Sequence, residues 1–265
     1  MPFAQLGPGR VFYTDHGTGT PPLLLIHGWT CDSHDWRAQV GAFAAEHRVI
    51  VPDLRGHGRS SVPATGYVPR AFAADLVALL DHLGVQEFVP IGHSLGAVVA
   101  AVLAVEQAGR VLACVSVDPA YGLDDAEAAT VLRQVEELRS PRGPHVAGVI
   151  LEASEAAPSP ALRAWRRDRI AGLRPHVVAE TFAGLFEPAD QVAMRPASAA
   201  YLRRRTCPVL AVHASSVRAD WERELAAHPR SRVVTWCDTG HWPHQERPDE
   251  FNALVLEWLA GLRLR

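Results

Sequence analysis

Residues 89–97 read Val-Pro-Ile-Gly-His-Ser-Leu-Gly-Ala, an apolar run that ends in the pattern Gly-x-Ser-x-Gly. A long segment rich in Ala, Val and Leu follows at once, so the pattern predicts a strand, a sharp turn and a helix, with Ser94 at the apex. Gly92 and Gly96 leave room where a side chain would collide with a neighbouring strand or helix. This context favours Ser94 as a nucleophile over a residue of an ordinary glycine-rich loop. The N–H of Leu95 lies at the helix N-terminus, where it can donate to an oxyanion.

The bulk composition narrows the class of protein. The chain has 265 residues, of which 48% are hydrophobic and 21% charged, with a formal net charge of −3. These values are ordinary for a globular protein. All 26 basic residues are arginine, which excludes a lysine Schiff base or a lysine general base. Because no basic block is present, we expect a small-molecule substrate and neither nucleic acid nor a membrane as a partner.

The cysteines and the N-terminus indicate a cytoplasmic protein. Cys31, Cys114, Cys207 and Cys237 form no C-x-x-C pair, which is typical of reduced thiols rather than of disulfides or a zinc site. The first residues lack the charged and apolar regions of a signal peptide, and no apolar run approaches membrane-spanning length. No nucleotide, flavin or metal motif is visible, so we expect no cofactor and no metal.

Short apolar strands and amphipathic helices alternate along the first 118 residues. Strands are expected at residues 10–14, 23–26, 49–51, 89–92 and 111–117, and helices at residues 35–47, 69–83 and 95–107. This alternation is typical of a parallel α/β sheet with helices on both faces.

The next stretch contains only helical patterns. Helices are expected at residues 124–138, 145–155, 159–170 and 176–186, strands again at 208–213 and 232–236, and a last helix at 248–262. We therefore predict a core in two parts, residues 1–118 and 206–265, with an inserted helical cap at residues 119–205. Such a cap would lie over the carboxyl edge of the sheet, where ligands bind in open α/β folds.

Four motifs in this order resemble the α/β-hydrolase fold over essentially the whole chain. They are His27-Gly28-Trp29, the segment DLRGHGRS at residues 53–60, Gly92-His93-Ser94-Leu95-Gly96, and the segment GHWPHQERPDEF at residues 240–251. The resemblance implies a mostly parallel central sheet with helices on both faces and an inserted helical cap. It also implies Ser94 as nucleophile, His241 as base, and an oxyanion hole formed by the N–H groups of Trp29 and Leu95. The local sequence supports His241 as the base. It follows an expected strand and lies in an irregular loop, where a histidine can take a proton from a serine.

The acid that should orient His241 departs from the family's commonest pattern. The family usually places it four residues beyond the penultimate strand, where this chain has Val217. A minority of relatives take the acid from the end of the strand after the nucleophile helix, which is Asp118 here. We predict Asp118 as the third catalytic residue, with Asp220 and then Asp238 as alternatives. If Asp118 is not catalytic, its ordinary role would be to cap the turn that follows its strand.

Several other residues receive secondary assignments. His27 and His57 are interpreted as structural residues that bond backbone turns, and a zinc site at His241 and His244 is disfavoured because the sequence contains no H-E-x-x-H motif. Substrate-binding residues are predicted by their position in the cap or beside the motifs: His93, Trp165, Phe182, Phe186 and Trp242, with Met194 as a further cap residue.

Three functions fit these motifs. The first is hydrolysis of an ester, lactone or related bond of a small apolar or aromatic substrate through an acyl-enzyme. In acid placement the chain resembles zearalenone-type lactonases and cofactor-free 3-hydroxy-4-oxoquinoline 2,4-dioxygenases, so the second is cofactor-free oxygenation with His241 and Asp118 as base. The dioxygenases carry extra histidines where this chain has Leu95 and Cys31, which favours hydrolysis. The third is a non-catalytic small-ligand receptor of the same fold.

Overall fold

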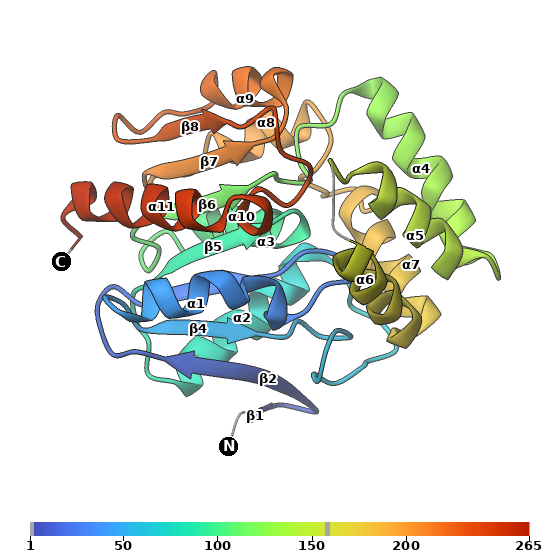
Figure 1. Cartoon of the computed structure of the whole chain (residues 1–265), viewed down its shortest axis with the longest axis horizontal. Helices are drawn as coiled ribbons and strands as arrows, with labels where there is room; N and C mark the ends of the chain where they lie inside the picture. The colour runs from blue at the N-terminus through green and yellow to red at the C-terminus, as the bar shows by residue number, and fades with distance from the viewer. Residues whose placement is uncertain (1–2, 157–159, 265) are drawn as a thin grey trace.

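One mixed sheet forms the centre of the protein (Figure 1). The computed structural model describes residues 3–156 and 160–264, and within them the eight-stranded sheet has the order β1-β2-β4-β3-β5-β6-β7-β8. The strands are β1 (Phe3–Leu6), β2 (Gly9–His16), β3 (Leu23–Ile26), β4 (Val49–Pro52), β5 (Val89–His93), β6 (Cys114–Val117), β7 (Val209–His213) and β8 (Arg232–Thr235). The β1–β2 and β2–β4 pairs are antiparallel, and every pair from β4 to β8 is parallel. The predicted fold class is confirmed.

Two apolar layers cover the sheet, one on each face. Successive side chains of a strand point to opposite faces, so Leu24 and Ile26 of β3 pack in one cluster, while Leu23 and Leu25 pack in the other. The first cluster includes α2 (Pro69–His82) and α3 (Leu95–Glu106), and the second includes α1 (Arg37–Ala44) and α11 (Pro248–Leu262). Burial on both faces explains why β3 and β4 read as continuous apolar runs and why β5 and β6 are largely apolar.

A group of helices lies beyond the carboxyl ends of the parallel strands, on the right in Figure 1. The chain reaches it between β6 and β7. Its members are α4 (Asp125–Arg139), α5 (Gly143–Ala153), α6 (Pro160–Gly172) and α7 (Pro175–Phe186). The short α8 (Ala197–Leu202) lies outside this group and contacts α3. The helices α4, α5 and α7 pack on one another, and this group places apolar side chains above the end of β5.

The remaining elements are short. A 3-10 helix, η1 (Ser33–Trp36), precedes α1, and α9 (Ser216–Arg223) and α10 (Pro243–Glu246) follow β7 and β8. The strand predicted at residues 111–117 begins only at Cys114, because Val111 forms just an isolated bridge to Phe88. The helix predicted from residue 159 is described from Pro160, since residue 159 lies outside the described residues.

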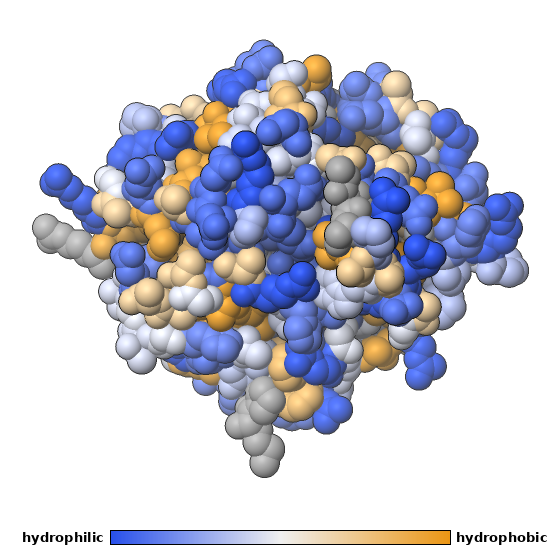
Figure 2. Space-filling model, viewed as in Figure 1, coloured by the Kyte–Doolittle hydropathy of each residue, from blue (hydrophilic) through white to orange (hydrophobic). Residues whose placement is uncertain are grey.

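The exterior of the protein is mostly polar, in contrast to the apolar layers on the two faces of the sheet. In Figure 2, hydrophilic residues cover most of the visible face, and hydrophobic residues occur in small separate groups. In the described part of the chain, no helix has both the length and the apolar character needed to cross a membrane.

Candidate active site

Ser94 stands at a strained turn between β5 and α3. Its backbone has φ 53° and ψ −115°, a conformation that non-glycine residues seldom adopt. The turn is held from outside the motif, because the Ser94 N–H donates to the Val117 carbonyl at 3.0 Å. A Cβ on Gly92 would lie 2.1 Å from the Gly96 carbonyl oxygen, and a Cβ on Gly96 would lie 2.1 Å from that of Ile26. Both glycines are therefore required for the close approach of the helix to the sheet.

A methyl group at the second glycine should be strongly destabilising. Because its closest neighbour would be the backbone of β3, which cannot rotate away, we expect Gly96→Ala to lower the free energy of unfolding by at least about 2 kcal/mol. Gly148→Ala is the matched control, since Gly148 lies inside α5 with open space around a Cβ, and it should stabilise by about 0.5–1 kcal/mol. Urea unfolding measures both changes, and equal effects of the two substitutions would contradict this account.

His241 and Asp118 meet from two distant segments. The His241 Nδ1–H donates to Asp118 Oδ2 at 2.5 Å, and the other carboxylate oxygen accepts the Ala214 N–H at 3.0 Å. Asp118 directly follows β6 and has φ 38°, with its N–H bonded to the Val212 carbonyl at 2.7 Å. The carboxylate is thus fixed by β7 on one side and engages the histidine on the other, which leaves His241 Nε2 free to act as a base.

The charge of Asp118 is stabilised by these partners. Burial disfavours the ionised carboxylate, but the hydrogen bond and charge of His241 and the Ala214 N–H outweigh it and hold the pKa of Asp118 below its ordinary value. Asp118 is therefore ionised at neutral pH and can orient the imidazole and stabilise its protonated form.

The alternative acids lie elsewhere. The side chain of Asp220 is 71% exposed and pairs with Arg223 on the same helix. Asp238 pairs with Arg247 at 3.3 Å, and its side chain is 67% exposed. Neither carboxylate contacts His241, so of the three candidates the structure brings only Asp118 to the histidine.

Ser94 and His241 line one cavity of about 370 Å³, together with Asp118 and Trp29. In the described part of the chain no hydrogen bond joins Ser94 Oγ to His241. Such contacts are often long without substrate and shorten in the reactive complex. The N–H groups of Leu95 and Trp29 have no acceptor among the described residues, and Leu95 is the first residue of α3. The two N–H groups that the resemblance assigns to an oxyanion hole are therefore without a partner among the described residues, as donors to an oxyanion would need to be.

The cavity wall is largely apolar. Phe182 and Phe186 of α7 and Trp242 lie on it, and Trp29 contacts α7 by donating from Nε1 to the Val178 carbonyl at 2.9 Å. The wall also includes residues that the sequence analysis did not single out: Leu123, Val131, Gln134, Ile150, Leu151, Leu185 and Arg218.

Trp165 corrects the predicted wall. Its ring lies against the guanidinium groups of Arg37 and Arg169, at 5.2 and 4.3 Å, and does not line the cavity. The inward positions of α6 are Arg166 and Ile170, so the helix turns Trp165 toward α1 instead. Met194 is likewise not on the described wall and forms a bridge to Leu123.

His93 supports the loop that carries His241. It is 1% exposed, and its Nε2–H donates to the His241 carbonyl at 2.7 Å. Burial lowers the pKa of His93 well below its ordinary value, so the ring is neutral and its Nδ1 is an acceptor. His27 and His57 have the structural roles predicted: His27 Nε2 accepts the Leu54 N–H at 3.0 Å, and His57 Nδ1 bonds the Arg55 carbonyl at 2.9 Å.

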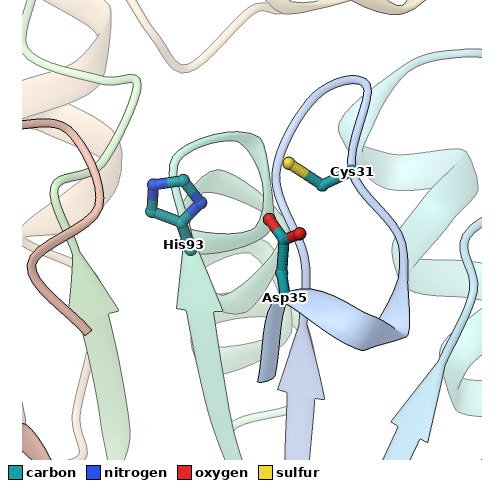
Figure 3. Close-up of side chains that lie close together, drawn as sticks. All are labelled: Cys31, Asp35 and His93. Carbon is teal, nitrogen blue, oxygen red and sulfur yellow. The ribbon is translucent and has the colours of Figure 1, made fainter. Parts of the chain in front are cut away.

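A buried group of possible metal ligands includes His93 (Figure 3). One ligand atom each of Cys31, Asp35 and His93 lie within 4.8 Å of one another. The guanidinium of Arg169 pairs with Asp35 and donates to Cys31 Sγ at 3.2 Å. Burial raises the pKa of the Cys31 thiol well above its ordinary value. Since Arg169 already supplies the positive charge and the thiol is protonated, the cluster fits a packed polar contact better than a metal site.

Buried neutral histidines should make the protein sensitive to mild acid. Burial lowers the pKa of His57 and His244 to about 3 and that of His93 well below 6.5. Below about pH 6.5 the unfolded chain binds protons that the folded chain does not, so stability falls as pH falls. From pH 7 to pH 5.5 we expect a loss of about 1 kcal/mol per histidine in urea unfolding. Carboxylates contribute only at lower pH, and an unchanged stability over this window would contradict the assignment.

The chain matches one protein family over most of its length. Residues 23–254 match the sequence profile of the Alpha/beta hydrolase family. Epoxide hydrolase A of Mycobacterium tuberculosis is 30% identical in an alignment that covers 93% of this chain and 92% of that protein. The chain therefore belongs to the alpha/beta hydrolase family, and in that sense it is an α/β-fold hydrolase.

Other similar proteins carry different names. An esterase from Thermogutta terrifontis has a TM-score of 0.82 and 28% identity, with 98% of this chain and 97% of that chain covered. A non-heme haloperoxidase of Rhodococcus erythropolis is 41% identical, but the match covers 42% of this chain and 41% of that protein. The chain thus spans less than half of this curated relative, and the names of the relatives differ in activity.

Proposed function

We propose that the protein is a serine-dependent hydrolase that cleaves an ester, lactone or related bond of a small substrate through an acyl-enzyme. Ser94 is the nucleophile, His241 the base and Asp118 the acid. The observation that carries the proposal is the hydrogen bond of 2.5 Å between His241 Nδ1 and Asp118 Oδ2, made beside a serine that a strained turn presents to the same cavity. The apolar wall supports a substrate with an apolar or aromatic part.

The chemistry follows from these positions. Ser94 Oγ attacks the substrate carbonyl while His241 Nε2 takes its proton, and Asp118 stabilises the imidazolium that forms. The N–H groups of Leu95 and Trp29 donate to the oxyanion, and loss of one such donor typically costs about 3 kcal/mol of transition-state stabilisation. His241 then gives its proton to the leaving oxygen and activates a water that attacks the acyl-enzyme.

Ester hydrolysis with and without oxygen tests this function. A panel of 4-nitrophenyl esters and aromatic lactones is assayed by proton release in air and under nitrogen. The proposal predicts hydrolysis at the same rate in both. Oxygen-dependent consumption of a 3-hydroxy-4-quinolone without ester hydrolysis would replace it with cofactor-free oxygenation.

A further inference from the structure

Arg218 is the one arginine on the described wall of the cavity that holds Ser94 and His241. It comes from α9, which begins three residues after β7 ends. The chain contains no lysine, and the Asp118 carboxylate is already engaged by His241 and Ala214. Arg218 therefore brings a guanidinium, ion-paired with Glu127, to a wall that is otherwise mostly apolar.

The guanidinium is held in place but not fully used. It donates from Nη1 to the Tyr121 carbonyl at 3.0 Å and from Nη2 to Glu127 Oε1 at 2.7 Å. Glu127 is fixed in turn, because its other oxygen accepts the Asp124 N–H at the start of α4. A guanidinium has five N–H donors, so three of them have no partner among the described residues. A guanidinium that is already held in place and still has unpaired N–H donors can bind an anion with little further loss of side-chain entropy.

A neutral polar group lies on the same wall. Glu127, Val131 and Gln134 are spaced four and three residues apart on α4, so they share one face of that helix. Val131 and Gln134 line the cavity, and the Gln134 amide makes no hydrogen bond within the described residues. An amide donor is therefore available on the face of α4 that also carries the partner of Arg218.

We propose that Arg218, with Gln134, forms a carboxylate-binding subsite, so that the preferred substrate is an ester or lactone that carries a carboxylate away from the bond to be cleaved. The inference rests on the proposed hydrolase function. The planar guanidinium matches a carboxylate in a bidentate pair, while the apolar wall takes the part of the substrate between the two ends. Glu127 shares the guanidinium and moderates its attraction for an anion.

Matched esters test the subsite. One series comprises 4-nitrophenyl half-esters of succinic, glutaric, adipic and suberic acid, and a second comprises butyrate esters of 4-hydroxybenzoic and 4-hydroxyphenylacetic acid. Each acid is compared with its own methyl ester as the ratio of the two kcat/KM values. For at least one pair, the wild type should prefer the acid by roughly tenfold or more. Arg218→Gln should bring that ratio near one, and Arg218→Lys should retain part of it. Glu127→Gln should raise it.

Controls separate this inference from the function on which it rests. Arg223→Gln changes an exposed arginine of the same helix that pairs with Asp220, and it should leave both the ratio and the rate unchanged. Circular dichroism and thermal unfolding establish that Arg218→Gln is folded despite the lost bond to Tyr121. Hydrolysis of acids and methyl esters at equal rates in the wild type would overturn the proposed subsite but not the proposed hydrolase function. An acid preference that survives Arg218→Gln would have the same consequence. Absence of hydrolysis in both series would count against both proposals.

Discussion

Ser94→Ala should lower kcat/KM for ester hydrolysis by about 10⁴-fold or more, because the variant has no oxygen with which to form the acyl-enzyme. The side chain is small and stands at the surface of the cavity, so the fold should be retained. The measurement is steady-state hydrolysis of the best 4-nitrophenyl ester, with protein folding checked by circular dichroism. Turnover near that of the wild type would rule out the acyl-enzyme route.

Asp118→Asn should lower turnover by about 10³–10⁴-fold without unfolding the protein. An asparagine oxygen can still accept the Ala214 N–H, which Asp118 Oδ1 now accepts at 3.0 Å. The amide nitrogen would then face His241 Nδ1, so the imidazole would be held in the tautomer that cannot take the serine proton from Nε2. The measurement is kcat at saturating ester.

Asp220→Asn is the matched control for the acid. Asp220 is the alternative that the sequence left open, and it is exposed and paired with Arg223. This substitution should leave turnover within about twofold of the wild type, as surface changes usually do. If it reduced activity strongly while Asp118→Asn did not, Asp118 would be the wrong assignment for the acid.

Seven of the eight described strands and most helices could be predicted because their signals are local, whereas β1 was not expected. The helix expected at residues 248–262 coincides with α11, whose apolar positions repeat at helical spacing and whose first residue is a proline. The serine turn could also be predicted, since two glycines and the flanking apolar runs specify it within nine residues. Motif order then led to His241, although its distance from Ser94 in the sequence is large.

The cavity wall could not be predicted to the same depth. Trp165 was expected on it, but the direction of a residue on α6 depends on which face packs inward, and Arg166 occupies that face. Arg218 carried no motif, and its partners Tyr121 and Glu127 lie 97 and 91 residues away. Val217 stands where the family commonly has its acid. The carboxylate of Glu222, five residues later, does not reach His241 but accepts hydrogen bonds from His213 and Arg205 in a buried network. Such contacts arise only when the chain is folded.

The central claim is that His241 activates Ser94 as a nucleophile. Labelling with a fluorophosphonate tests this claim most directly. The probe forms a covalent bond only with a serine made nucleophilic by its surroundings. Wild type and His241→Ala are treated alike, and intact and peptide masses locate the adduct. The account predicts a single adduct on Ser94 that is lost in the His241 variant. A folded wild type without an adduct on Ser94, or equal labelling of the two proteins, would contradict it.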